Sequence, residues 1–205
     1  MIAGDTKTER ALEKLLVDRA LAGDKAALRE LVDQHKDRLF AFIWRMARNH
    51  HDAEDICQDA FLKAFASLAS FSSEYRFSTW LFTIAYRVCL NKMRRKRALT
   101  GEVDFTTLPL KADEDPDAAL ESEDAARVRE LIWEAVDRLT PPQRACVLLF
   151  YRHEMSCQEM SRVVQLPLAT VKSHLHRARA KLREMLEPVS ENDLQVFRNL
   201  SVRTG

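Results

Sequence analysis

The amino-acid sequence predicts an all-α protein with two small helical domains joined by a flexible acidic linker. Its 205 residues include only 4 glycines, and runs of β-branched residues are few, so strands are not expected. Apolar residues recur every three or four positions through most of the chain, as in helices that bury one face. With 46% hydrophobic residues, the chain can bury real cores.

The N-terminal domain, residues 1–98, is predicted to be a helical bundle. A first, short helix ends near Gly23. Its apolar residues are Leu12, Leu15, Leu16 and Ala20. A second helix over residues 24–48 is expected to begin with Asp24 as its N-cap. Its core-facing residues are Ala27, Leu28, Leu31, Val32, His35, Leu39, Phe42, Ile43 and Met46.

Two further helices complete this domain. One is predicted over residues 52–69 with Asp52 as its cap. Its buried stripe is Ala53, Ile56, Cys57, Ala60, Phe61, Ala64, Phe65 and Leu68. The other is capped by Ser78 and continues to about Arg97. Its inner face is Trp80, Leu81, Ile84, Ala85, Val88 and Cys89.

Charge is segregated along the chain, although the net charge is only +1. Residues 75–101 carry seven cations and no acid, and residues 160–183 carry six cations and no acid. Between them, residues 102–124 carry nine acids and one base. The acids, prolines and paired threonines of residues 99–124 predict a linker. Two basic segments without acids favour a polyanionic partner.

The C-terminal domain, residues 125–187, is predicted to hold four helices and to be followed by a tail, residues 188–205. A helix runs from near Ser122 to Leu139. Its buried face is Val128, Leu131, Ile132, Ala135, Val136 and Leu139. The next helix starts at Thr140, with Pro141 in the first turn and Gln143 at the return position of a capping box.

The last two helices form a predicted helix-turn-helix. The sequence "SCQE", residues 156–159, has capping-box spacing and opens a short helix ending near Val164. After "QLP", a longer helix runs from Leu168 to about Glu187. The inward residues are Met160, Val163, Val164, Leu166, Val171, Leu175, Ala178 and Leu182. The outward residues, suited to base edges and phosphates, are Thr170, Lys172, Ser173, His176, Arg177, Arg179 and Lys181.

The sequence "NHHDAEDICQDAFLKAF", residues 49–65, concentrates histidines, carboxylates and a cysteine that could suggest a metal site. Helical spacing divides them: Cys57 is expected to point inward, and Asp55, Gln58 and Asp59 outward. The two histidines are placed at the cap, before the helix begins. This arrangement predicts a docking surface, with no metal, cofactor or catalytic residue.

Three motifs in this order resemble the extracytoplasmic-function group of bacterial sigma factors, the two-domain initiation subunits of RNA polymerase. They are "DAEDICQDAFLKAF", "FSTWLFTIAYRVCLNKMRRKR" and the segment from "LTPPQR" to "KLREML". The resemblance covers roughly residues 20–98 and 125–187. It implies that the chain binds core RNA polymerase and promoter DNA, and that an anti-sigma factor controls it.

The resemblance also implies roles for individual residues. Asp55, Gln58 and Asp59 would contact core polymerase. The −10 promoter element would be bound by Ser72, Ser73, Glu74, Tyr75, Arg87, Asn91, Arg94 and Arg95. The −35 element would be bound by Lys172, Ser173, His176 and Arg177, and the outward face adds Thr170 and Arg179. The acidic linker would pass through the polymerase where nascent RNA later runs.

The sequence departs from the family pattern at three positions. Arg87 replaces a usual Asn, and Gln165 and Ala169 replace frequent glycines. Either Gln165 adopts a left-handed conformation at a cost of about 1 kcal/mol, or the turn differs in detail from that of the family.

Two other functions fit parts of the sequence. A stand-alone helix-turn-helix regulator accounts for residues 156–187 but leaves the docking helix and the first basic helix without a role. A metal phosphohydrolase would use "HHD", residues 50–52, but no later helix supplies the further ligands. We expect a protein that is not an enzyme. A cytoplasmic location without membrane insertion is also expected, since no stretch approaches about 18 apolar residues and the N-terminus lacks signal-peptide order.

Overall fold

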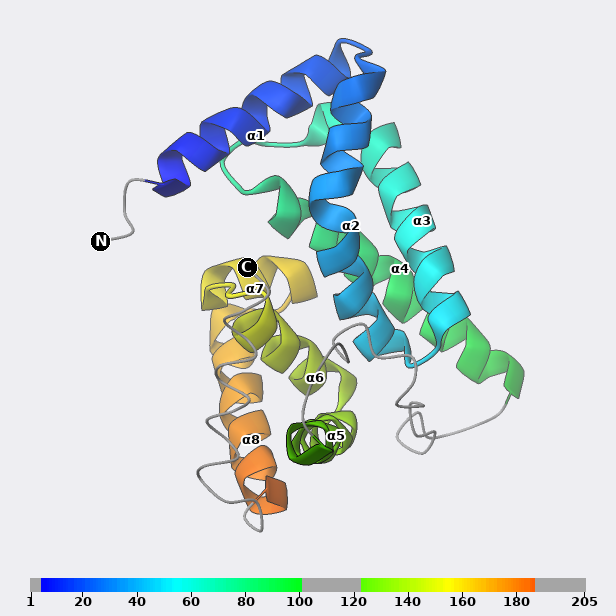
Figure 1. The fold of residues 1–205 in the computed structure, drawn as a ribbon, viewed down its shortest axis with the longest axis vertical. Helices are drawn as coiled ribbons and strands as arrows, with labels where there is room; N and C mark the ends of the chain where they lie inside the picture. The colour runs from blue at the N-terminus through cyan, green and yellow to red at the C-terminus, as the bar shows by residue number, and fades with distance from the viewer. Residues whose placement is uncertain (1–4, 101–122, 187–205) are drawn as a thin grey trace. The chain divides into compact units, whose positions relative to one another are not determined.

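The structure, a computed structural model, describes residues 5–100 and 123–186. These residues form helices and no strand (Figure 1), which confirms the all-α prediction. The chain divides into two compact units, Met1–Leu99 and Thr100–Gly205. Most of the predicted linker and all of the predicted tail lie outside the described residues. None of the described helices is long and apolar enough to cross a membrane.

Unit 1 contains α1 (Asp5–Leu21), α2 (Lys25–Ala47), α3 (His50–Ala66), the 3₁₀ turn η1 (Leu68–Ser70) and α4 (Phe77–Thr100). α2 packs against both α1 and α3 (Figure 1). The predicted break between the first two helices is confirmed, because Gly23 has a φ of 88°. The predicted cap is confirmed as well: Asp24 accepts hydrogen bonds from the N–H groups of Ala26 and Ala27 at 2.8 and 3.3 Å.

Aromatic side chains join α2 to α4 in the core of unit 1. The Phe42 ring lies 5.2 Å from the Phe82 ring and 6.4 Å from the Tyr86 ring, measured between centroids. All three side chains are buried, and burying a large apolar side chain stabilises a fold by about 1.5–3 kcal/mol. Phe77, Phe82 and Tyr86 are absent from the inner face predicted for this helix. α4 is therefore buried over a wider arc than the predicted stripe.

Both remaining helix starts in unit 1 differ from the prediction. Asn49, not Asp52, caps α3: the Asp52 N–H donates to Asn49 Oδ1 at 2.9 Å. His50 and His51 therefore lie in the first turn of α3, not before it. α4 begins at Phe77, so Ser78 lies in its first turn and is not its cap. In α1, the predicted apolar residues Leu16 and Ala20 are buried, whereas Leu12 and Leu15 are 62% and 57% exposed.

Unit 2 contains α5 (Glu123–Asp137), α6 (Pro141–Val147), the π-helical turn η3 (Leu148–Arg152), α7 (Cys157–Val164) and α8 (Leu168–Leu186). The two helix starts that were predicted from capping boxes, at Thr140 and Ser156, are confirmed. The Thr140 N–H donates to Gln143 Oε1 at 3.2 Å. The Ser156 N–H donates to Glu159 Oε2 at 2.9 Å, and Ser156 Oγ accepts from the Glu159 N–H at 3.3 Å. The π-helical turn η3 was not predicted.

A buried arginine connects α6 to the end of α5. Arg144 is 2% exposed, and its Nε donates to the Val136 carbonyl at 3.4 Å. Its Nη2 donates to the Asp137 carbonyl. Because the last carbonyls of a helix lack partners within the helix, Arg144 supplies a donor to the Asp137 carbonyl and a second donor to the Val136 carbonyl, which also accepts from the Leu139 N–H at 3.1 Å. Position 144 was not singled out in the sequence.

Candidate partner-binding surfaces

α3 exposes the three polar side chains that the sequence placed on its outer face. Asp55, Gln58 and Asp59 are all exposed, and their spacing places them on one side of the helix. Ile56 and Cys57 are buried on the other side. Burial raises the pKa of the Cys57 thiol to about 12, so this cysteine is a protonated packing residue at neutral pH.

A leucine lies one turn beyond these polar residues on the same face and was not predicted as part of the surface. Leu62 is 67% exposed and follows Gln58 and Asp59 by four and three positions, so it shares their face. Exposed leucines are ordinary when isolated, but Leu62 directly follows the amide of Gln58 and the carboxylate of Asp59 on the same face of the helix. The helical spacing was a sufficient signal to find it. We call Asp55, Gln58, Asp59 and Leu62 the α3 face.

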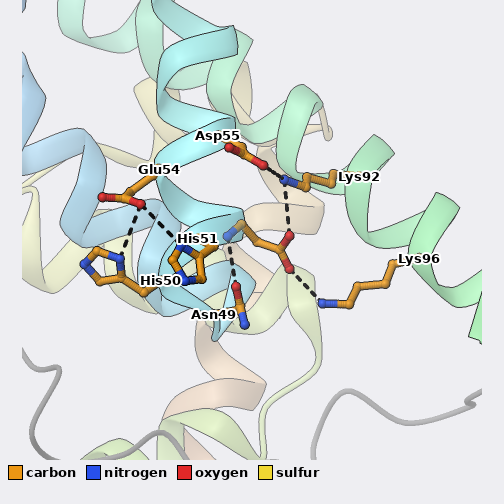
Figure 2. Close-up of polar contacts among 8 residues, drawn as sticks. Asn49, His50, His51, Glu54, Asp55, Lys92 and Lys96 are labelled. Atoms are coloured by element: carbon orange, nitrogen blue, oxygen red, sulfur yellow. Dashed lines mark hydrogen bonds and ion pairs between the residues drawn. The ribbon is translucent and has the colours of Figure 1, made fainter.

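Two lysines of α4 form ion pairs with carboxylates of α3 (Figure 2). Lys92 Nζ lies 2.8 Å from Asp55 Oδ2 and 3.2 Å from Asp52 Oδ1. Lys96 Nζ lies 2.8 Å from Asp52 Oδ2. Asp52 thus bridges two lysines one helical turn apart, and Asp55 shares one of them. These contacts hold the N-terminal half of α3 against α4.

The ion pairs shift the ionisation of their members. Partial burial of the Asp52 carboxyl acts to raise its pKa, but hydrogen bonds from Lys96 and Lys92 outweigh burial and lower the pKa below its ordinary value. Burial of the Lys92 ammonium acts to lower its pKa, and the bonds to Asp55 and Asp52 raise it instead. Both groups are therefore charged at neutral pH.

The basic residues of α4 divide between two sides of the helix. Half-buried Lys92 and exposed Lys96 pair with carboxylates of α3, and the exposed residues Arg87, Asn91, Arg94 and Arg95 lie farther round the helix. Arg94 Nη2 donates to Asn91 Oδ1 at 3.0 Å. The exposed group consists of the four α4 residues predicted to bind −10 DNA. An exposed row of cations suits a nucleic-acid backbone.

The loop before α4 presents the other residues predicted for −10 binding. Ser72, Ser73 and Glu74 are exposed, and Tyr75 is half-buried. Phe71 anchors the start of this loop, because its ring lies 5.7 Å from Phe77 and 5.5 Å from Trp80, between centroids. The packing of Phe71 therefore fixes one end of the loop, whose three exposed polar side chains directly precede α4, the helix that carries the cations.

α7 and α8 form the predicted helix-turn-helix. Its inward residues Met160, Val163, Val164, Val171, Leu175 and Ala178 are buried, and Leu166 and Leu182 are half-buried. Gln165 has φ 56° and ψ 42°, so of the two alternatives it adopts the left-handed conformation. Ser161 Oγ donates to the Leu166 carbonyl at 2.6 Å and closes the turn.

The outer side of α8 carries the residues predicted to bind −35 DNA. Lys172, His176 and Arg177 are exposed, and Thr170 and Ser173 are half-buried. No acid lies between Leu168 and Arg183. This side therefore presents two cations, an imidazole and two hydroxyls without a competing carboxylate, which suits base edges and phosphates.

Two basic residues of α8 make contacts inside unit 2. Arg179 Nε donates to Tyr151 Oη at 2.8 Å, and its guanidinium lies 4.9 Å from the centre of the Phe150 ring. Lys181, predicted to face outward, donates from Nζ to the Arg138 carbonyl at 2.8 Å just beyond α5. Lys181 thus stabilises the packing of α5 on α8, and η3 supplies the two aromatic side chains that hold Arg179.

Comparison with known proteins identifies both units. A family model of sigma-70 region 2 matches residues 31–99, and a model of sigma-70 region 4 matches residues 129–182. The first match includes α3 and most of α4, and the second includes α6, α7 and most of α8.

Relatives share these regions over most of their length. The ECF RNA polymerase sigma factor SigW of Bacillus subtilis (strain 168) is 34% identical over 180 residues, which cover 84% of this chain and 96% of SigW. The ECF RNA polymerase sigma factor SigE of Mycolicibacterium smegmatis is 33% identical over 179 residues, which cover 84% of this chain and 68% of SigE.

A solved structure has the same fold. The sigma factor RpoE of Bartonella quintana, solved in complex with the anti-sigma factor NepR, superposes with a TM-score of 0.65 at 23% identity, over 79% of this chain and 98% of RpoE. The order of region 2 and region 4 defines the class of sigma-70-type transcription factors. Within that class, the chain belongs to the extracytoplasmic-function (ECF) RNA polymerase sigma factors.

Proposed function

We propose that this chain is an alternative sigma factor that binds core RNA polymerase and directs it to specific promoters. The observation that carries the proposal is the match of region 2 and region 4 to the two units that bear the α3 face and the acid-free side of α8. A stand-alone helix-turn-helix regulator would use only the second of these surfaces. A sigma factor uses both, and it works without a catalytic site of its own.

The α3 face is the proposed contact with core polymerase. Two carboxylates and an amide precede one exposed leucine on this face. Such a composition offers a partner both charge selectivity and an apolar contact. Substituting Gln58→Ala together with Asp59→Arg is expected to abolish core binding without changing the fold. A matched control on α2 is Gln34→Ala with Asp33→Arg, since both positions are exposed. Equal loss in the control would count against a contact at the α3 face.

Promoter DNA is the proposed partner of α4, the loop before it, and α8. The exposed cations and amide of α4, with Ser72, Ser73, Glu74 and Tyr75, would bind the −10 element as a melted strand with an unstacked base. On α8, Lys172, Ser173, His176 and Arg177 would contact −35 bases and phosphates, and Thr170 and Arg179 would lie at the edges of this contact. Residues 99–124 would serve as the acidic linker between the two DNA-binding units.

Control by an anti-sigma factor in the cytoplasm is part of the same proposal. The Bartonella quintana sigma factor with this fold was solved with an anti-sigma factor bound. Core polymerase is a cytoplasmic enzyme, so a chain that acts with it is expected in the same compartment. Affinity purification of the chain from unstressed native cells is expected to yield a small inhibitory protein in stoichiometric amounts. Recovery of core polymerase alone would contradict control by an anti-sigma factor.

A gel-shift assay with and without core polymerase tests the proposal against the regulator alternative. The isolated chain is expected to bind promoter duplex weakly, because −10 recognition needs a melted strand. Adding core polymerase should produce a specific complex that competitor DNA does not remove. Tight, sequence-specific binding by the chain alone, unchanged by core polymerase, would establish the regulator instead.

A further inference from the structure

The first turn of α3 brings together three side chains that have no part in the α3 face. His50 Nδ1 and His51 Nδ1 each lie 3.6 Å from the same carboxylate oxygen, Glu54 Oε2 (Figure 2). One ligand atom of each residue lies within 4.8 Å of one ligand atom of each of the other two. Among the described residues, this is the one group of three histidine, cysteine or carboxylate side chains this close together.

The spacing of these atoms fits a shared ion better than direct hydrogen bonds. A normal N–H···O bond has its heavy atoms about 2.7–3.2 Å apart, so 3.6 Å is too long for either histidine. Two ligands bound about 2.0–2.1 Å from a tetrahedral metal lie about 3.4 Å apart. Both nitrogen–oxygen distances are therefore close to the separation that a bound metal would impose.

Of the two histidines, His50 is held in place by packing and His51 is open to solvent. The His50 ring packs edge-on against Phe40, with centroids 5.2 Å apart, which restricts its orientation. His51 has 91% of its side chain exposed, so solvent can complete the coordination. The partially positive N–H groups of the helix start stabilise the ionised Glu54 carboxylate but disfavour a cation, so the negative charge of Glu54 has to offset them. All three ligands come from one turn, so no other element has to move.

Neighbouring carboxylates belong to a separate set of contacts. Asp52 and Asp55 are paired with Lys92 and Lys96 of α4 (Figure 2). These ammonium groups would repel a cation at either aspartate. The two imidazoles and the single carboxylate of Glu54 therefore set the ligand chemistry of this turn.

We propose that His50, His51 and Glu54 form a three-ligand site for a first-row divalent transition metal, with Zn²⁺ as the probe ion. Two imidazole nitrogens and one carboxylate select such ions over Mg²⁺ and Ca²⁺, which prefer all-oxygen sites. Three protein ligands leave at least one position for water. The site goes beyond the proposed sigma-factor function and does not depend on it.

Calorimetric titration of the untagged full-length chain with ZnCl₂ tests the site. The wild-type chain is expected to bind one Zn²⁺ there, while Mg²⁺ gives no heat. His51→Gln and Glu54→Gln should each weaken binding by about 10-fold or more, since loss of a residue that only supports a metal ligand already costs about 10- to 100-fold. Both positions are exposed, so circular dichroism should show an unchanged fold.

Two control variants distinguish this site from other zinc ligands in the chain. His176→Gln changes an exposed histidine on α8, and Cys157→Ser changes the one cysteine that is not buried. Both should retain wild-type affinity. The proposal is overturned if wild-type protein binds no Zn²⁺, if His51→Gln and Glu54→Gln bind it as tightly as wild type, or if Mg²⁺ binds equally well.

Discussion

Replacing Leu62 by alanine should weaken binding to core polymerase while leaving the isolated chain stable. Leu62 exposes 67% of its surface, and complete burial of a leucine side chain is worth about 1.5–3 kcal/mol. Burying the exposed two thirds at an interface would therefore contribute about 1–2 kcal/mol, and losing it should raise the Kd by about 5- to 30-fold. Alanine is a good helix former, so α3 itself should not be disturbed.

Competition binding with a fluorescently labelled chain and purified core polymerase measures this change. Leu12→Ala is the matched control, because Leu12 is 62% exposed and lies on α1, away from the α3 face. The control should bind with wild-type affinity, and thermal melts of both variants should match wild type. A Leu62→Ala variant that binds core polymerase normally, or a Leu12→Ala variant that loses as much affinity, would refute an apolar contact at the α3 face.

Three further predictions concern stability and are all read by thermal or denaturant unfolding. The folded-state pKa of Asp52 is lowered from its ordinary 3.8, so its stabilising effect is complete above that pH and is lost as the pH falls through the folded-state pKa; Asp52→Asn should therefore be less stable than wild type at neutral pH, with the difference vanishing in strong acid. Arg144→Met should destabilise unit 2 by about 3–5 kcal/mol, because it removes the guanidinium that lies 3.9 Å from the buried Asp137 carboxylate and donates to the Asp137 carbonyl; a loss below about 1 kcal/mol would show that this buried charge and carbonyl are satisfied without Arg144. Gln165→Gly should stabilise the turn by about 0.5–1 kcal/mol. The left-handed conformation costs a residue with a side chain about 1–2 kcal/mol, and glycine avoids this cost but loses more conformational entropy on folding. A destabilised variant would show that the contacts of the Gln165 side chain outweigh the strain.

Helix starts that are set by hydrogen bonds between residues a few positions apart were predictable from the sequence. The start of α3 was not, because it depends on where α2 ends. Asp24 and the Ser156–Glu159 pair cap their helices through bonds to residues two or three positions away, which the sequence displays directly. At α3, both Asn49 and Asp52 are good caps. The chain leaves α2 through Arg48 in a left-handed conformation, with φ 57°, so the next residue, Asn49, already occupies the cap position.

Contacts between distant residues could not be predicted from spacing. Lys92 pairs with carboxylates 37 and 40 positions earlier in the chain, and only the packing of α4 on α3 brings them together. Arg144 was missed because a buried arginine has the same sequence signature as an exposed one. Leu62 was within reach of the prediction, since helical periodicity places it beside Asp59, but only polar residues were assigned to the outer face and Leu62 was assigned to neither face.

The roles of individual polar residues stay predictions, although their placement follows from helical periodicity. Asp55 and Gln58 are exposed as expected, and Asp55 is also paired with Lys92. Arg177 and Arg179 are both exposed as expected, and Arg179 is also bonded to Tyr151. Periodicity identifies the outer side of a helix, but it does not reveal which of its polar groups are bonded to a neighbouring element.

Run-off transcription with core polymerase on a promoter library tests the central claim most directly. The chain is expected to produce transcripts from a small set of promoters that share both a −10 and a −35 sequence, and core polymerase alone should produce none. Arg177→Ala should lower transcription from these promoters by weakening the −35 contact. If the chain and core polymerase together yield no promoter-specific transcript, the assignment as a sigma factor is contradicted.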